Sequence, residues 1–298
     1  MFLRVSAALS IGAEMKAKSK SKSQSLNLRN PKQVNVINSF AISEGRLSKE
    51  DIYSIGNKDI FYRMKNGGFI KETVKGSGVF KATSKLKGLV SKTEGISFGN
   101  GCSNKHSKAI TRATQYLPKE IVTQGRFKSG QSLKSEMDSF RQSGKYHRKV
   151  EHIKQSISER RNSAKQRYQT KVNSGISRSE QYQAKLDYRN EMKQIDIQSE
   201  IINSANPVFI PDFMIQATRD EAQEILENLQ ARYDEAEDGR ERSFLCDDID
   251  KMKAMIDTAT TDTIDIYVEI VTDSYGNAKL ERHRNYETIT DRPVIYLC

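Results

Sequence analysis

Strand-forming runs in this chain of 298 residues are concentrated in its last third, and they limit the fold more than any other feature. The runs VFIPDFMI, IDIYVEIV and PVIYL are rich in β-branched and aromatic residues, although Pro211 places the first at a sheet edge or a bend. An acidic stretch from 218 to 261 repeats apolar residues every three or four positions around a break at Gly239. We therefore expect a small sheet with a helical hairpin inserted between two of its strands.

Two of the runs carry a carboxylate at their centre, Asp212 after Pro211 and Glu269 in the acidic strand. Neighbouring strands can direct such oxygens toward one divalent cation. Asp212 and Glu269 are therefore our candidate metal ligands and catalytic acids, with Mg²⁺ or Mn²⁺ as the expected cofactor if the site is active.

Charge is divided unevenly along the chain. Residues 1 to 200 carry 39 Lys and Arg against 17 Asp and Glu, whereas the last 98 residues carry 10 against 21. A basic body of this size is typical of a protein that binds nucleic acid, because neutralised phosphates release their counterions. A basic surface with no specific partner is the alternative.

Other classes of protein fit less well. The three cysteines form no CxxC pair, which argues against a disulfide framework or a zinc ribbon, and no stretch approaches a membrane span. We expect a cytoplasmic protein with no membrane partner. Residues 1 to 30 read as a disordered Lys/Ser arm, within which Met15 is an alternative start to Met1.

Order begins near Pro31. Residues 31 to 92 predict three helices followed by two strand-like runs, which are joined by the basic turn KGSG. This arrangement resembles the winged helix-turn-helix family, whose third helix enters the major groove and whose hairpin follows the DNA backbone. The resemblance implies that Lys58, Tyr62, Arg63 and Lys65 face DNA and that Lys75 and Lys81 flank the wing tip. Winged helices also serve as protein-docking modules, so that alternative stays open.

The middle of the chain predicts helices with few apolar residues. Residues 93 to 130 read as a loop and helix connection in which His106 is a cap or surface residue. Residues 131 to 176 predict a basic helical arm that ends at Gly175, with Arg160, Arg161 and Lys165 as candidate nucleic-acid contacts. The arm could lie on nucleic acid, form a homodimer as an imperfect coiled coil, or separate two domains.

Residues 177 to 298 resemble the PD-(D/E)xK nuclease-like superfamily through a helix, the PD strand, the acidic strand, a helix and a final strand. With the winged helix, the order is similar to that of the replication-relaxation proteins of plasmids and integrative elements. The resemblance makes Asp212 and Glu269 the metal-binding acids, with Glu191 or Glu200 in support and Asp273 as a further ligand. Val271 stands where a lysine is expected, and Lys279, Arg282 or Arg284 could replace it. Lys279 is our candidate.

The sequence therefore predicts a multi-domain α+β protein with a winged-helix domain, a long basic helical arm and a nuclease-like sheet carrying a helical insertion. The expected function is binding of double-stranded DNA for a mobile genetic element, in replication, mobilisation or regulation, with a degenerate nuclease-like domain. Whether it is an enzyme stays open. One alternative is a Mg²⁺- or Mn²⁺-dependent endonuclease, and another is a phage or plasmid inhibitor that binds a host nucleoprotein complex.

Overall fold

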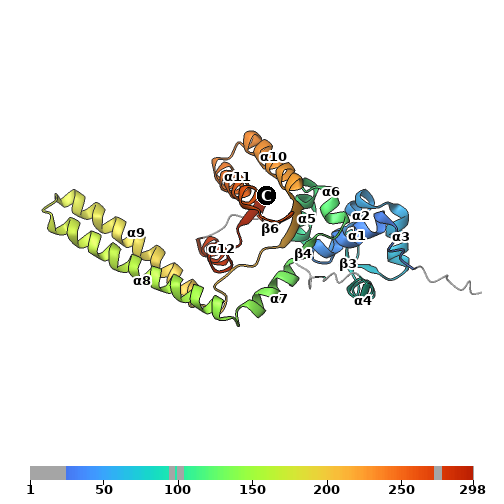
Figure 1. The fold of residues 1–298 in the computed structure, drawn as a ribbon, viewed down its shortest axis with the longest axis horizontal. Coiled ribbons are helices and arrows are strands. Elements are labelled where there is room, and N and C mark those ends of the chain that lie inside the picture. The colour runs from blue at the N-terminus through green and yellow to red at the C-terminus, as the bar shows by residue number, and fades with distance from the viewer. Residues whose placement is uncertain (1–24, 94–97, 99–103, 272–276, 298) are drawn as a thin grey trace, which may run out of the picture.

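The computed structural model describes residues 25–93, 98, 104–271 and 277–297, and it is an α+β structure in which helices surround two small sheets (Figure 1). The predicted arm at 1–30 lies almost wholly outside these residues, and so does Asp273. Within the described ranges, no helix combines the length and the apolar character needed to cross a bilayer.

The N-terminal unit is a three-stranded antiparallel sheet with helices packed on it. Its strands lie in the order β1-β3-β2. The elements are α1 (Pro31–Ile42), β1 (Arg46–Ser48), α2 (Lys49–Ile55), α3 (Lys58–Asn66), β2 (Ile70–Glu72), β3 (Val79–Ala82) and α4 (Ser84–Thr93). The first three helices are as predicted, and each begins at a side chain that accepts a backbone N–H: Asn30, Ser48 or Asn57.

Two details of this unit differ from the prediction. The strand β1 was not expected, because three residues are too few to show a period of two. The second strand-like run ends at Ala82, and the prediction that it continued was wrong. Leu86 and Val90 recur at a spacing of four and are fully buried, so this segment forms the helix α4.

The segment after α4 contributes more than a connection. It contains α5 (Asn104–Ala113), the 3₁₀ turn η1 (Thr114–Tyr116), α6 (Lys119–Thr123) and the short strand β4 (Phe127–Ser129). The strand was missed because only its pairing with β5 defines it, with Phe127 opposite Ile215. Residues 104–129 therefore belong to the larger sheet and its core.

The predicted arm at 131–176 contributes one helix of a hairpin that projects from the rest of the chain (Figure 1), and residues 177–202, which were assigned to the nuclease-like domain, contribute the other. The hairpin consists of α8 (Gly144–Asn173) and α9 (Arg178–Ile202), and the turn at Gly175 has a positive φ of 72°. Helix α7 (Gly130–Phe140), which precedes it, packs on the larger sheet. The sparse apolar residues of α8 meet those of α9, and Ile157, Ala164 and Ile195 are buried along the seam. The apolar residues of α8 are thus buried against α9 of the same chain.

The larger sheet has the strand order β4-β5-β6-β7. Pairing is antiparallel except between β6 and β7, which are parallel and connected through a helix. The remaining elements are β5 (Phe213–Thr218), α10 (Arg219–Glu235), α11 (Gly239–Thr258), β6 (Thr263–Ile270), α12 (Asn277–Thr290) and β7 (Val294–Leu297). The predicted helical insertion and last strands are confirmed. The first run becomes a strand only at Phe213, because Pro211 has no N–H to donate.

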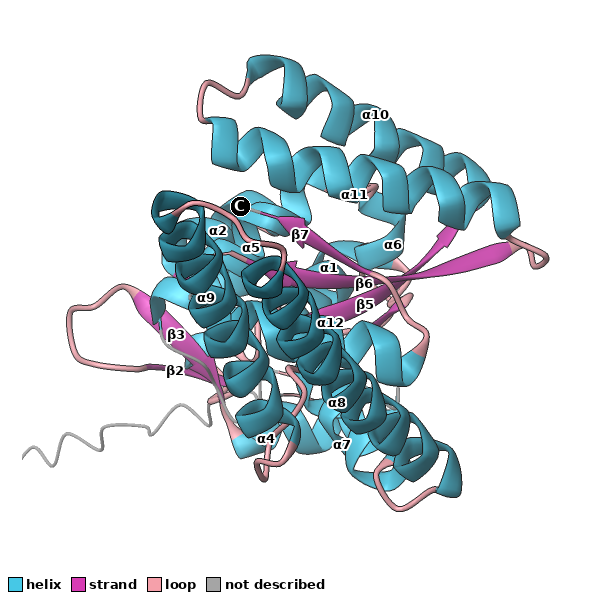
Figure 2. Ribbon diagram, turned by 90° about the vertical axis from the view of Figure 1, so that its left-hand side faces the viewer, coloured by secondary structure: helices cyan, strands magenta, loops and turns pink. Residues whose placement is uncertain are grey.

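Helices cover both faces of this sheet. On one face, Ile215, Ile266 and Val268 pack against α5, α10 and α11. On the other, Met214 and Tyr267 pack against α7, α8 and α12, and Figure 2 shows α10 and α11 on the side away from α12. The two central strands are therefore buried on both faces.

The N-terminal unit is joined firmly to this core. Ile42 at the end of α1 belongs to the same apolar cluster as α10 and β5. Asn38 Nδ2 donates to the carbonyl of Val122 at 2.8 Å, and the hydroxyls of Ser43 and Thr111 lie 3.0 Å apart in a buried contact. Buried polar contacts of this kind fix the orientation of α1 on α5 and α6.

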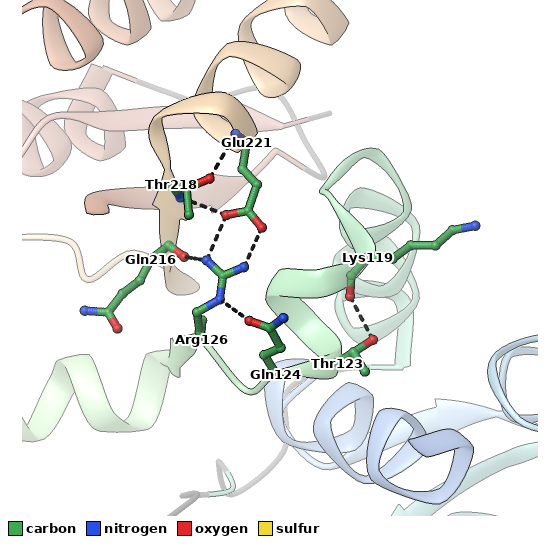
Figure 3. A network of polar contacts seen from close by, with 7 residues as sticks. All are labelled: Lys119, Thr123, Gln124, Arg126, Gln216, Thr218 and Glu221. Atoms are coloured by element: carbon green, nitrogen blue, oxygen red, sulfur yellow. Dashed lines mark hydrogen bonds and ion pairs between the residues drawn. The ribbon is translucent and has the colours of Figure 1, made fainter. Parts of the chain in front are cut away.

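A charged cluster holds β4 against the start of the acidic hairpin (Figure 3). The guanidinium of Arg126 donates to both carboxylate oxygens of Glu221, to the carbonyl of Gln216 at 2.7 Å and to Gln124 at 2.9 Å. Glu221 also completes a capping box with Thr218 at the start of α10. The hydrogen bond with Arg126 is the main cause that lowers the pKa of Glu221 from 4.5 to about 2.

We expect Glu221→Gln to lower the free energy of unfolding by about 2 kcal/mol at pH 7, because it removes a charge-assisted bidentate contact. Since the pKa of Glu221 is depressed in the folded state, this stabilisation is present above about pH 4.5 and is lost as the pH falls toward 2. Urea unfolding from pH 3 to 7 measures it. Glu224→Gln on the exposed side of α10 is the matched control, and an equal loss in both variants would contradict the prediction.

Candidate functional site

The two predicted acids lie at matching positions of neighbouring strands. Phe213 of β5 pairs with Val268 of β6. Asp212 precedes Phe213 and Glu269 follows Val268, so the two acids lie opposite each other in this antiparallel register. Both side chains therefore lie at the same end of the β5–β6 pair, as expected from the sequence. Their surroundings decide what they can do.

Asp212 is held through both of its oxygens. Oδ1 accepts a hydrogen bond from Nε2 of His106 at 2.7 Å, and Oδ2 accepts one from the backbone N–H of Ile270 at 2.8 Å. The carboxylate thus ties α5 and the end of β6 to the start of β5. The carboxylate of Asp212 is only 13% exposed.

His106 was predicted as a cap or surface residue, and that interpretation was wrong. The hydrogen bond to Asp212 raises its pKa above 6.5, and the nearby charge of Glu44 adds to the effect. No sequence signal identified this pair, because 105 residues separate the two side chains. His106 therefore carries a positive charge over a wider pH range than a free imidazole.

Glu44 enters the same region from the N-terminal unit. It has a positive φ of 53°, which is unusual for a residue with a side chain, and it lies in the turn between α1 and β1. Gly130 packs directly against this region. A Cβ at Gly130 would lie 2.8 Å from the carbonyl oxygen of Asp212 and 3.1 Å from Oε1 of Glu44. Only glycine allows this close approach.

Glu269 is almost completely buried, at 2% exposed, and meets two basic side chains of α12. Its Oε1 lies 3.8 Å from Nζ of Lys279 and 3.7 Å from Nε2 of His283. Burial lowers the pKa of His283 to about 4, so this imidazole is neutral at pH 7. Lys279 therefore supplies the positive charge that offsets Glu269.

The basic residues of α12 that could replace the strand lysine differ in whether they contact Glu269. Lys279 and His283 are four residues apart and share one helix face, which brings both to Glu269. Arg282 instead donates to the carbonyl of Asn206 at 3.0 Å, and Arg284 is exposed near Glu281. Of the three residues considered as substitutes for the strand lysine, only Lys279 has a described contact with Glu269.

The contacts that the two acids make bear on the predicted metal site. In the described part of the chain, no three His, Cys, Asp or Glu residues are grouped so that they could bind a metal. Both oxygens of Asp212 accept hydrogen bonds, from His106 and a backbone amide, whereas Glu269 has Lys279 and the neutral His283 nearby at 3.8 and 3.7 Å. The supporting acids considered on α9 lie in the arm, where Glu191 pairs with Arg167. The site is a cluster in which two carboxylates lie beside positively charged or imidazole side chains.

The predicted nucleic-acid contacts on α3 point outward. Lys58, Arg63 and Lys65 are exposed and Tyr62 is 49% exposed, while Ile60, Phe61 and Met64 of the same helix are buried. Lys75 is exposed in the turn between β2 and β3. Lys81 lies within β3 and does not flank the turn, because the strand has already begun at Val79.

The three predicted nucleic-acid contacts on the arm differ in whether they contact the neighbouring helix. Arg160 donates to Gln198 at 2.6 Å, and Arg161 pairs with Asp196 at 2.7 Å, so both connect α8 to α9. Lys165 is exposed and has no hydrogen bond or ion pair with the described residues. The arginines thus have a structural role that the sequence did not indicate.

Comparisons with family models, with curated proteins and with solved structures find no match for this chain.

Asp212→Asn should lower the pKa of His106, because it removes the charge that favours the imidazolium. In the wild-type protein, the raised pKa stabilises the fold fully below about pH 6.5, and this contribution is lost as the pH rises through the folded-state value. A histidine NMR titration measures the shift. Asp138→Asn on the exposed side of α7 is the control, and a pKa of His106 that is equal in both variants would contradict the assigned pair.

Proposed function

We propose that this chain is a DNA-binding protein of a mobile genetic element, such as a plasmid, phage or integrative element, that acts in replication, mobilisation or regulation. In this proposal the N-terminal unit is a winged helix that binds the duplex. The C-terminal sheet is a nuclease-like scaffold that holds its acids in ion pairs and does not cut.

The observation that carries the proposal is the arrangement of the N-terminal unit. Its order of helix, strand, two helices and hairpin, with the strands ordered β1-β3-β2, is what a winged helix requires. The third helix presents three cations and a tyrosine on its outer face. Cations on such a helix contact phosphates and guanine edges in the major groove.

The larger sheet supports the second part of the proposal, that the C-terminal region is a nuclease-like scaffold. The order of β5, β6, α12 and β7 follows the PD strand, acidic strand, helix and final strand on which the resemblance rests. The acids occupy the expected ends of two strands, and Lys279 reaches Glu269 from the following helix. Because both oxygens of Asp212 are hydrogen-bonded within the chain and Lys279 lies beside Glu269, we infer that the core serves as a platform.

Charge separation along the chain favours the same interpretation. Helix α8 carries nine Lys and Arg residues against two Glu, whereas α10 and α11 are rich in Asp and Glu. The DNA backbone would be attracted to the arm and repelled by the acidic hairpin.

Binding of the full chain to a fluorescent DNA duplex tests the first part. We expect Arg63→Ala to weaken binding about tenfold or more, as for the loss of one base-edge contact. Lys32→Ala, an exposed lysine on α1, is the control and should bind as the wild type does. If the wild type binds no duplex, single strand or RNA at moderate salt and co-purifies with a host nucleoprotein complex, the inhibitor alternative is favoured.

A cleavage assay tests the second part. We expect no cutting of supercoiled, linear or single-stranded DNA with Mg²⁺ or Mn²⁺, because Asp212 and Glu269 are already neutralised by the chain itself. Cleavage by the wild type that is lost in Asp212→Ala would instead establish the endonuclease alternative.

A further inference from the structure

A cavity of about 150 Å³ lies where α7, the first turn of α8 and the end of α12 meet. Leu133, Met137 and Phe140 of α7 form its apolar side, and the first two of these are almost completely buried. Tyr286 and Thr290 of α12 line the opposite side. A cavity of this volume has room for one ring of about the size of benzene.

Three charged side chains surround the cavity: Arg292, Lys145 and Glu136. Two of them already have a close partner outside its lining. Lys145 lies 3.4 Å from a carboxylate oxygen of Asp291, and Oε1 of Glu136 lies 2.6 Å from Nζ of Lys128. Lys145 is exposed, so it marks the side on which the cavity meets solvent.

Arg292 is held in place by contacts that leave some of its donors available. Its guanidinium lies over the ring of Tyr267, 5.0 Å from the centroid, and its Nη1 lies 3.7 Å from Oε2 of Glu136, which is longer than a hydrogen bond. Burial raises the pKa of the Tyr286 hydroxyl, and the adjacent Arg292 partly offsets that rise. A guanidinium has five N–H donors in a planar fork, so a further acceptor can be bound.

We propose that this cavity binds a small aromatic carboxylate, whose ring lies between α7 and α12 and whose carboxylate pairs with Arg292. Apolar walls with one convergent charged group are typical of small-molecule sites. The fork of a guanidinium matches the two oxygens of a carboxylate, and the nearby charge of Lys145 also favours an anion.

The site goes beyond the proposed function, because none of its residues is a proposed DNA contact. Helix α7 leads into α8 through a short turn in which Ser143 caps α8. A ligand in the cavity therefore connects the base of the arm to α12.

A titration of the full chain, labelled at its methionine methyl groups and followed by NMR without DNA, tests the site. Benzoate should shift the methyl signal of Met137 saturably, with a Kd of about 1 mM for a ligand of this size. Met64, which is buried in the N-terminal unit, should not shift. Benzyl alcohol has the same ring without the charge and should bind about tenfold more weakly, because it loses the charge-assisted hydrogen bonds.

A substitution of the guanidinium tests its assigned role. Arg292→Gln should weaken benzoate binding about tenfold, to the affinity of benzyl alcohol. Its affinity for benzyl alcohol should stay that of the wild type, which shows that the cavity is intact. Arg284→Gln, at an exposed position of α12, is the matched control and should bind benzoate as the wild type does.

The wild-type comparison is decisive even if Arg292→Gln does not fold. The absence of a saturable Met137 shift at about ten times the expected Kd of benzoate would overturn the proposal. Equal affinity for benzoate and benzyl alcohol would also overturn it, and so would a preference for benzylammonium, which would point to Glu136. Because no DNA is present, these results are independent of whether the chain binds a duplex.

Discussion

The rest of the structure depends on the antiparallel pairing of β5 with β6. The two strands are joined over six residue pairs and are buried on both faces, by α5, α10 and α11 on one side and by α7, α8 and α12 on the other. Buried backbone N–H and C=O groups must form hydrogen bonds. This ladder of hydrogen bonds therefore requires that both strands are extended side by side. The insertion of α10 and α11 is tolerated because the hairpin leaves and returns at the same end of the pair.

This pairing also brings two acids into a poorly solvated region, and the surrounding contacts follow from that. A buried carboxylate is costly unless charges or hydrogen bonds compensate it. Asp212 receives the imidazole of His106 and the amide of Ile270, and Glu269 receives Lys279. Each compensating side chain comes from a helix that packs on the sheet. For Asp212 these contacts use both carboxylate oxygens, and for Glu269 they place a positive charge beside one of them.

The sequence predicted the features that local chemistry determines. Three helices form between Pro31 and Asn66 as expected, and the arm helix ends near Gly175. The meeting of Lys279 with Glu269 could also be anticipated, since the helix follows the acidic strand directly. Pairing across long separations could not be anticipated. Strand β4 exists only through its contact with β5, and His106 reaches Asp212 only after α5 has packed on the sheet.

The junction between the two sheets has a consequence for how DNA would be presented. Ile42 is shared by the apolar core of the larger sheet, and Asn38 and Ser43 are hydrogen-bonded to the segment that leads into β4. These contacts hold the N-terminal unit, which carries α3, against the core of the larger sheet. Under the proposed function, a duplex bound at α3 would be attracted to the basic arm and repelled by the acidic hairpin. The division of charge along the chain thus becomes a division of surfaces in space, and the rigid junction is what maintains it.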